Sequence, residues 1–317
     1  MNAFAFVFPG QGSQSVGMLD AWADRVEVRH TVQEASDALG EDLGQLIHEG
    51  PKEALALTTN TQPVMLVAGV AAWRVWQAEQ GALPKAVAGH SLGEYSALVA
   101  AGVLTLSQAA PLVRLRAAAM QEAVPVGAGA MAAVLGLPAA TVVQVCQQVT
   151  AEMQAEGTAD VAEAVNFNDP GQTVIAGTKA GVERASQALK AAGAKRALPL
   201  PVSAPFHSSL MRPAAEKLKD ALAGLELAAP QIPVINNIDV AVVDDVQGIK
   251  DALYRQAFGP VRWVEVVQAI AARGITHIVE AGPGKVLAGM SKRIAPDLVS
   301  AALYDPATLA EVKELLA

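Results

Sequence analysis

Short apolar runs that end at a glycine turn alternate along the chain with longer stretches of helical period. Residues 3–8 form the first run, which Pro9 and Gly10 close, and residues 85–88 form a second run that leads into Gly89. A buried strand, a tight glycine turn and a helix, in that order, are typical of a parallel α/β domain. Helices are expected over residues 61–79, where Thr61 can act as the N-cap, and over residues 94–101 and 106–122.

The middle of the chain has a different order of elements. After a flexible stretch at residues 125–130, the pattern predicts the order β-α-β-β-α-β over residues 131–135, 139–155, 163–168, 173–176, 180–192 and 195–199. This is the ferredoxin-like order. We therefore predict a small domain, residues 128–197, inserted into a larger α/β domain made of residues 1–127 and 198–317. The larger domain resumes with elements at residues 209–222, 233–236, 249–256, 262–272 and 277–280.

The composition excludes several classes of protein. Of the 317 residues, 23 are basic and 31 are acidic, and a net charge of −8 argues against nucleic acid as the main partner. The longest apolar stretch, residues 64–73, is shorter than the roughly 20 residues of a membrane span. The histidines are scattered and Cys146 is the single cysteine, so no metal site is expected. No basic residue precedes Arg25 and Pro9 interrupts the first apolar run, unlike a signal peptide, so we expect a cytoplasmic protein.

The strongest candidate for chemistry is the sequence Gly89-His90-Ser91-Leu92-Gly93, which fits the nucleophile elbow G-x-S-x-G. Such a turn raises the serine hydroxyl above the sheet and directs the first free N–H groups of the next helix at the same point. The position between an apolar strand and an amphipathic helix favours this interpretation. An ordinary strand-to-helix turn, with the serine as a helix cap, is the alternative.

A serine nucleophile needs a base, and His207 is the best candidate. It follows a stretch with three prolines in seven residues, 199–205, which predicts a stiff loop where the chain re-enters the larger domain. An imidazole on a fixed loop suits a general base near neutral pH. The alternative is that it caps the helix beginning near Ser209. His90 is a poor candidate, because on an elbow its side chain points away from the serine.

Two arginines lie on the helix predicted over residues 106–122. Residues two apart on a helix point about 200° from one another, so at most one of the two faces inward. Arg116 shares its face with bulky apolar residues and Arg114 does not, so we expect Arg116 inside. A buried arginine requires an anionic partner, which either a substrate carboxylate or an internal salt bridge can supply.

Several motifs of the chain occur together in one known family. They are FPGQGSQ at residues 8–14, TQP at 61–63, GHSLGEYSALVAAG at 89–102, Arg116, NFNDPGQ at 166–172, PVSAPFHS at 201–208 and EAGPGKVL at 280–287. Together they resemble the malonyl-CoA:acyl carrier protein transacylases over essentially the whole chain, in the same order. The resemblance implies an α/β-hydrolase-like large domain with a parallel sheet and an inserted ferredoxin-like domain, with the catalytic cleft between them.

The resemblance also implies which residues carry the chemistry. Ser91 is expected to be the nucleophile and His207 the base that activates it. A backbone carbonyl orients the histidine in this family, and Gln256 occupies the matching position.

Substrate binding is implied in the same way. The backbone N–H groups of Gln11 and Leu92 are expected to form the oxyanion hole. Arg116 is expected to bind the malonyl carboxylate through two parallel hydrogen bonds, and Gln62 to contribute to substrate binding. From the residues alone, the glycine-flanked Gln11 is only a weak signal.

The implied function is transfer of the malonyl group from malonyl-CoA, through a serine ester, to the phosphopantetheine thiol of holo-acyl carrier protein. The mechanism is ping-pong, the pathway is fatty acid biosynthesis, no cofactor is needed, and a monomer is expected. The alternatives are a discrete acyltransferase of a polyketide or malonate-decarboxylase system, a serine esterase, or a catalytically silent docking subunit.

Docking of an acidic carrier protein on this acidic chain requires a local basic patch. The candidate residues are Lys285, Lys292 and Arg293, with Lys195 and Arg196 at the domain junction. Scattered solubilising charge is the alternative interpretation.

Overall fold

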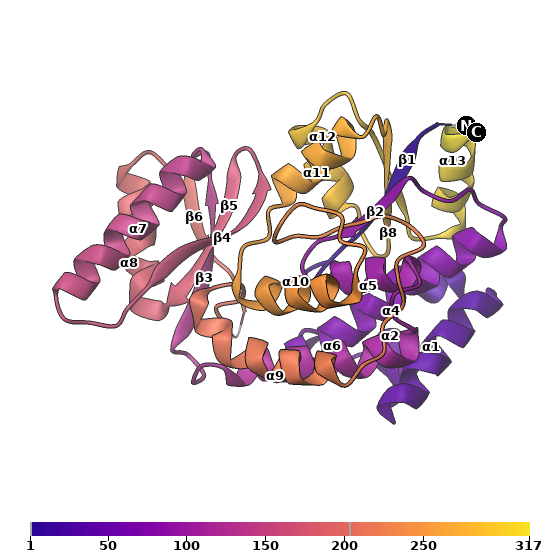
Figure 1. Ribbon diagram of the computed structural model, residues 1–317, viewed down its shortest axis with the longest axis horizontal. Coiled ribbons are helices and arrows are strands. Elements are labelled where there is room, and N and C mark those ends of the chain that lie inside the picture. Colours follow the sequence, from indigo (N-terminus) through magenta and orange to yellow (C-terminus); the bar gives the residue numbers. More distant parts are fainter. Residues whose placement is uncertain (1, 203) are drawn as a thin grey trace.

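The chain forms two β-sheets, each covered by helices (Figure 1). The computed structural model describes residues 2–202 and 204–317, so Ser203 of the proline-rich loop lies outside the described residues. The larger sheet has five parallel strands in the order β7 (Val234–Ile235), β2 (Ala86–Gly89), β1 (Phe4–Phe8), β8 (His277–Ala281) and β9 (Val299–Leu303). The predicted α/β fold class with a parallel sheet is confirmed.

Strand β1 lies in the middle of the parallel sheet and is buried on both faces. Phe4, Phe6 and Phe8 belong to one apolar cluster, whereas Ala5 and Val7 belong to another. Successive side chains of a strand point to opposite faces, so each cluster fills one side of the sheet. This is why a continuous apolar run, rather than an alternating one, marks the strand in the sequence.

Helices cover both faces of the parallel sheet (Figure 1). On one face lie α11 (Trp263–Ala272) and α12 (Val286–Ile294). The cluster on the other face is built with α1 (Val26–Leu39), α2 (Leu43–Glu49), α3 (Lys52–Leu55), α4 (Thr58–Ala78), α5 (Gly93–Ala100), α6 (Leu106–Glu122), α9 (Arg212–Ala223), α10 (Val246–Phe258) and α13 (Pro306–Leu316). Among the described residues, no helix combines the length and apolar character needed to cross a membrane.

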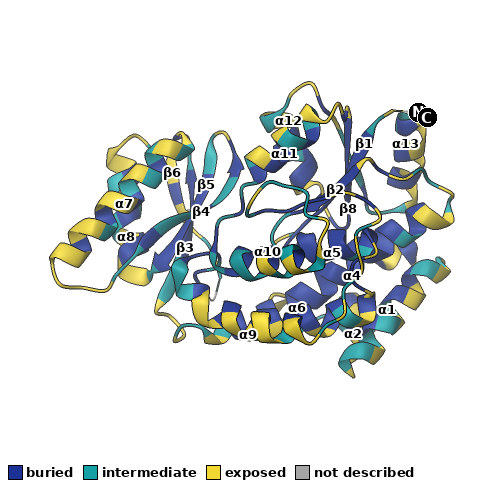
Figure 2. Ribbon diagram, viewed as in Figure 1, coloured by how far each residue is buried: buried dark blue, intermediate teal, exposed yellow. Residues whose placement is uncertain are grey.

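The smaller sheet is antiparallel and has the ferredoxin-like strand order. Its strands lie in the order β4 (Ala162–Asp169), β5 (Gln172–Thr178), β3 (Gly129–Leu135) and β6 (Arg196–Pro199). Helices α7 (Ala139–Ala155) and α8 (Lys179–Ala191) pack on one face of this sheet, with their outer sides exposed (Figure 2). β6 ends at Pro199, and the domain boundaries at residues 128 and 197 stay a prediction.

Strand β4 of the smaller sheet forms backbone hydrogen bonds with the segment between α10 and α11 of the larger unit. The N–H of Phe167 donates to the carbonyl of Val261 over 2.9 Å, and the N–H of Val261 donates to the carbonyl of Val165 over 2.8 Å. Nearby, Arg293 of α12 pairs with Asp169 at 2.7 Å. These contacts fix β4 of the smaller sheet against the larger unit, directly beside the candidate site.

Some elements differ from the sequence prediction. Helix α4 begins at Thr58, three residues earlier than predicted, so Thr61 is not its N-cap and Pro63 lies inside the helix. The hydroxyl of Thr61 instead donates to the carbonyl of Leu57 over 3.0 Å. Strand β9 and helix α13 have no counterpart among the predicted elements. β9 is an edge strand with partly exposed side chains, and its sequence therefore lacks a strong apolar pattern.

Candidate active site

Ser91 lies at the turn between β2 and α5, in a left-handed backbone conformation with φ +52°. Glycines make this turn possible. A Cβ on Gly89 would lie 1.9 Å from the carbonyl carbon of Gly93, and a Cβ on Gly93 would lie 2.0 Å from the carbonyl oxygen of Phe8. Both positions therefore exclude any side chain, and the strained serine is held above the carboxyl end of the parallel sheet.

The imidazole of His207 faces this serine. Its Nε2 lies 2.6 Å from Ser91 Oγ, and its Nδ1 lies 2.9 Å from the backbone carbonyl oxygen of Gln256. A carbonyl oxygen can only accept, so Nδ1 carries the proton and Nε2 is free to accept the serine proton. His207 itself has φ +64°, a left-handed conformation like that of the serine.

His207 is held in its neutral form. Burial, and after it the positive charge of Arg116, lower the pKa of its imidazole to about 3. Only 4% of the residue is exposed. A neutral imidazole with a free Nε2 is the form that a general base requires at neutral pH.

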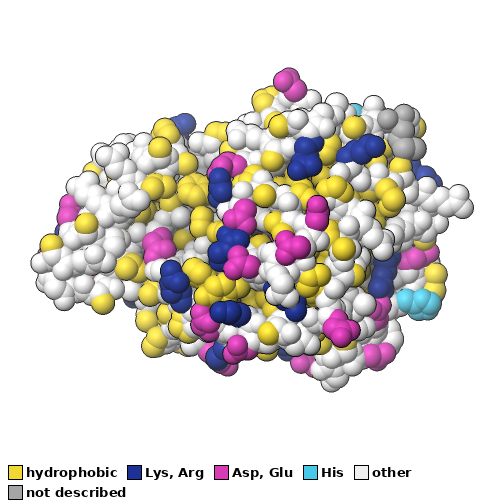
Figure 3. Space-filling view, viewed as in Figure 1, with side chains coloured by type: hydrophobic (Ala, Val, Ile, Leu, Met, Phe, Trp, Pro, Cys, Tyr) yellow, Lys and Arg dark blue, Asp and Glu magenta, His cyan; other side chains and the backbone are white. Residues whose placement is uncertain are grey.

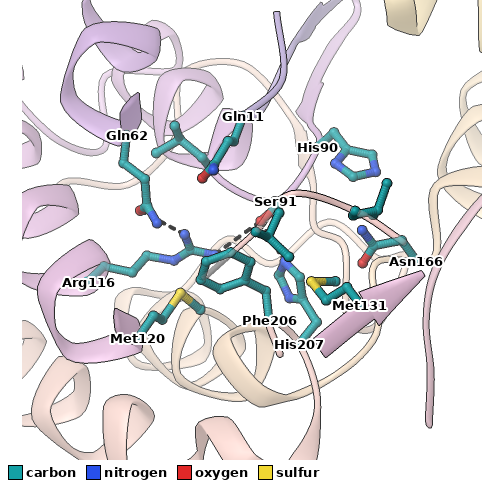
Figure 4. Close-up of a pocket in the computed structure, with 13 residues that line it drawn as sticks. Gln11, Gln62, His90, Ser91, Arg116, Met120, Met131, Asn166, Phe206 and His207 are labelled. Carbon is teal, nitrogen blue, oxygen red and sulfur yellow. Dashed lines mark hydrogen bonds between the residues drawn. The ribbon is translucent and has the colours of Figure 1, made fainter. Parts of the chain in front are cut away.

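Arg116 is buried, and its guanidinium reaches the serine from α6 (Figure 4). Nη2 donates to Ser91 Oγ and to Gln256 Oε1, each over 3.1 Å, and Nη1 donates to Gln62 Oε1 over 2.8 Å. All of these acceptors are neutral. Arg114 lies on the other side of α6 and pairs with the carboxylate of Glu41 at 2.8 and 2.6 Å. The prediction that Arg116 is the inward-facing arginine is confirmed, and its hydrogen bonds are to neutral groups rather than to an internal carboxylate.

A cavity of about 130 Å³ lies in front of the serine, between the two sheets. The smaller sheet contributes Met131 and Asn166 (Figure 4). The remaining lining residues come from the larger unit and the loop before His207: Gln11, Gln62, His90, Ser91, Leu92, Arg116, Met120, Leu200, Val202, Phe206 and His207. Apart from the guanidinium end, this lining is largely apolar, and such a cavity restricts the access of water to the serine.

Gln11 and Leu92 line the cavity together with the serine. Within residues 2–202 and 204–317, no acceptor takes a hydrogen bond from the backbone N–H of either residue. Leu92 directly precedes α5, so its N–H is one of the free donors at a helix N-terminus. Two unused donors beside a serine suit the stabilisation of an oxyanion.

Three polar residues at the site were not singled out individually from the sequence, whereas His90 was considered there and set aside as a base. His90 turns its Nε2 to Asn168 Oδ1, at 2.8 Å, as expected of a side chain that points away from the serine. Asn166 lines the cavity, Glu94 is buried in α5, and Asn237 contacts the turn itself. The two asparagines of the smaller sheet belong to the NFNDPGQ motif, whereas Asn237 lies in a loop without a recognisable signal.

No metal centre is found in the part of the chain that the structure describes, where no three His, Cys, Asp or Glu side chains are grouped so as to hold an ion.

Comparison with known proteins gives the family. The family model of the acyl transferase domain matches residues 5–302. A malonyl CoA-acyl carrier protein transacylase of Salmonella typhimurium is 54% identical over 310 residues, which cover 98% of both chains. The chain belongs to the malonyl CoA-acyl carrier protein transacylase family. A family member from Escherichia coli strain K12 is 53% identical and covers 99% of this chain and 100% of its own.

Solved structures of malonyl CoA-acyl carrier protein transacylases and their relatives have the same fold. The acyl-carrier-protein S-malonyltransferase of Burkholderia pseudomallei is 63% identical, with a TM-score of 0.95 over 98% of this chain and 99% of its own. A malonyl-transacylase in complex with a type II PKS acyl-carrier protein is 50% identical, with a TM-score of 0.95 over 99% of this chain and 100% of its own.

Proposed function

We propose that the chain is a malonyl-CoA:acyl carrier protein S-malonyltransferase with Ser91 as its nucleophile. The observation that carries this proposal is the hydrogen bond of 3.1 Å between Arg116 Nη2 and Ser91 Oγ. In a malonyl thioester, a single methylene group separates the carboxylate from the reacting carbonyl. A guanidinium in contact with the nucleophile therefore suits this short acyl group, and the hydrogen bonds that this guanidinium makes within the described part of the chain all go to neutral acceptors.

The first half of the reaction forms the acyl-enzyme. Ser91 Oγ attacks the carbonyl carbon of the thioester while His207 Nε2 takes the hydroxyl proton. The backbone N–H groups of Gln11 and Leu92 stabilise the oxyanion. The C–S bond then breaks, CoA leaves as the thiol with the proton from His207, and malonyl stays on the serine as an ester.

The second half transfers malonyl to the carrier. The phosphopantetheine thiol of holo-acyl carrier protein gives its proton to His207 and attacks the ester carbonyl. The C–O bond breaks, and Ser91 Oγ recovers the proton. Arg116 holds the malonyl carboxylate in both halves, with Gln62 supporting the guanidinium. No cofactor takes part in this ping-pong sequence.

The carrier and pathway are part of the proposal. Relatives named for the acyl carrier protein support a role in fatty acid biosynthesis. That the chain acts as a cytoplasmic monomer stays a prediction. The 50% identical malonyl-transacylase in complex with a type II PKS acyl-carrier protein supports polyketide carriers as a second candidate. A serine esterase is disfavoured, because a neutral ester leaves the buried cation of Arg116 unpaired.

A transfer assay tests the function. The chain is mixed with malonyl-CoA and either a holo-acyl carrier protein or the apo form, which lacks the phosphopantetheine thiol. We expect malonyl-carrier only with the holo form, detected by the mass of the carrier. Hydrolysis of malonyl-CoA at the same rate with both forms would contradict the proposal and favour an esterase.

A further inference from the structure

We propose that Asn237, in the loop after β7, is a positioning residue for the nucleophile. Its carboxamide bridges the two sides of the turn that carries Ser91. Oδ1 accepts from the backbone N–H of Ser91 over 2.7 Å, and Nδ2 donates to the backbone carbonyl of Gly89, also over 2.7 Å. The inference rests on the proposed role of Ser91 as the nucleophile.

The chemistry of this bridge requires a carboxamide. A backbone N–H can only donate and a carbonyl can only accept, so the side chain must offer one acceptor and one donor on the same small group. An aspartate carboxylate lacks the donor, and an apolar side chain lacks both. Asn237 is fully buried, so water does not replace these bonds, and the loss of either leaves a buried backbone group unpaired.

The hydrogen bonds of Asn237 support the backbone at Ser91, where its conformation is unfavourable. Ser91 has φ +52°, a conformation that residues with a side chain rarely adopt. Asn237 holds the peptide N–H on one side of Ser91, and Gln256 Nε2 holds its carbonyl oxygen on the other side over 2.9 Å. The two peptide groups fix the direction of the Cα–Cβ bond, and this direction places Oγ beside His207 Nε2.

Both supports are anchored on one buried carboxyl group. Glu94 Oε2 accepts from the backbone N–H of Asn237 over 2.9 Å and from Gln256 Nε2 over 3.1 Å. Glu94 itself lies on the first turn of α5, three residues after the serine. The turn, the loop after β7 and helix α10 are thereby tied together behind the nucleophile.

The loop that carries Asn237 is itself held rigidly. Asp239 receives two hydrogen bonds of 2.7 Å from Arg255, and the carbonyl of Ile238 accepts from Arg262 over 3.1 Å. Val240 has φ +57°, which is an unfavourable conformation for a β-branched residue. Such strain persists only where the surrounding structure imposes it, and it is concentrated at functional sites.

The test compares Asn237→Ala with Asn236→Ala, a matched control in the same loop. The side chain of Asn236 accepts a hydrogen bond from the backbone N–H of Asp239, and among the described residues it has no hydrogen bond with Ser91 or Gly89. Two rates are measured for each variant: malonylation by malonyl-CoA, and modification of Ser91 by phenylmethylsulfonyl fluoride, both followed by intact mass. Asn237→Leu, which keeps the volume of the side chain, serves if the alanine variant does not fold.

We expect Asn237→Ala to lower both rates in parallel by about 10²-fold, the scale of a nucleophile displaced by about 1 Å. The KM for malonyl-CoA and the ratio of malonyl to acetyl transfer should stay at the wild-type values, because the Arg116 pocket is unchanged. Asn236→Ala should leave both rates unchanged. A folded Asn237 variant that reacts at wild-type rates with both reagents would overturn the proposal.

Two measurements test the role of Asn237 independently of the proposed function. The sulfonyl fluoride reports the placement of Ser91 even if malonyl-CoA is not a substrate. Hydrogen exchange in the unsubstituted protein adds a test that needs no variant. The amide of Ser91 should be protected by its bond to Asn237, and exchange at the rate of a free loop amide would contradict the bridge.

Discussion

The guanidinium of Arg116 donates to the hydroxyl of Ser91 over 3.1 Å, so that the cation that lines the cavity also contacts the serine. In Figure 4 the side chain of Arg116 reaches Ser91 from the left, whereas the side chain of His207 lies below Ser91. The two side chains therefore divide the work between them. In the proposed mechanism His207 takes the hydroxyl proton, and Arg116 selects an acyl group with a carboxylate one methylene from the carbonyl.

Selectivity should depend on Arg116 and not on Arg114. Arg116→Ala should lower the ratio of malonyl to acetyl transfer by about 10²-fold, because hydrogen bonds to a charged group contribute roughly 1.5–3 kcal/mol and each 1.4 kcal/mol is tenfold. Arg116→Lys should recover part of the ratio, since an ammonium cannot form two parallel bonds. Steady-state rates of transfer from malonyl-CoA and from acetyl-CoA give this ratio for each variant. Arg114→Ala is the control, and an altered ratio in that variant alone would reverse the assignment.

The base should be essential for acylation. His207→Ala should lower the rate of acyl-enzyme formation by at least about 10²-fold, the usual scale for loss of a general base. Rapid quenching followed by intact mass gives the rate. Acylation of this variant at the wild-type rate would exclude His207 as the base.

The pH dependence should reveal the charge of Arg116. The pKa of His207 lies at about 3, below its ordinary value, because of burial and then of Arg116, so the neutral base persists well below pH 6.5. Removal of the cation in Arg116→Ala should raise this pKa and move the acid limb of serine modification to higher pH. Phenylmethylsulfonyl fluoride is the probe, since it carries no carboxylate that titrates.

Glu94 also titrates near the site, because burial raises its pKa to about 7. The pH comparison is therefore made between Glu94→Gln and the double variant Glu94→Gln/Arg116→Ala. With Glu94 replaced, the acid limb of serine modification reports the titration of His207. If the midpoint of the acid limb of serine modification stays at the same pH, or moves to lower pH, when Arg116 is replaced by Ala, the cation does not act on the base.

The elbow glycines should be required for folding. In Gly89→Ala the new Cβ meets backbone atoms of Gly93 at 1.9 and 2.0 Å, so we expect a loss of at least about 3 kcal/mol in the free energy of unfolding. Gly224→Ala is the control, because its Cβ has 3.7 Å to the nearest atom and the free energy should change by less than about 0.5 kcal/mol. Denaturant unfolding measures both, and equal stability of the two variants would refute the steric argument.

Carrier docking should depend on local basic charge. Lys285 and Lys292 are exposed at the two ends of α12, and no ion pair among the described residues includes either of them. Arg293 is partly neutralised by Asp169. Elsewhere, basic and acidic side chains are interspersed on the face seen in Figure 3.

Charge reversal of both lysines to Glu should raise the KM for holo-carrier and spare the KM for malonyl-CoA. The control is Lys217→Glu on α9, which breaks only an exposed ion pair with Glu122. An equal change in both KM values of the double variant would count against this patch.

The sequence was most informative where local geometry alone decides the outcome. The glycines of the turn, the face of the helix with Arg116 and the ferredoxin-like order of elements follow from spacing and periodicity, and the structure has all three. The start of α4 was misplaced because Pro63 normally marks the first turn of a helix, whereas here it lies in the second.

The network behind the nucleophile could not be predicted in this way. Asn237 and Glu94 are 143 residues apart, and their contact depends on how β7 pairs with β2. Asn237 lies in a short loop of ordinary composition, and Glu94 falls at a helical position where a solvated carboxylate is the usual expectation. Only tertiary packing reveals that both are buried beneath Ser91.

The most direct test of the central claim is the intact mass of the protein after mixing with malonyl-CoA alone. We predict one malonyl adduct per chain, located on Ser91 by peptide mapping, with release of CoA before any carrier is added. The adduct should be absent in a folded Ser91→Ala variant and should be discharged by holo-acyl carrier protein. A malonyl adduct on another residue, or transfer to the carrier by Ser91→Ala at the wild-type rate, would contradict the account.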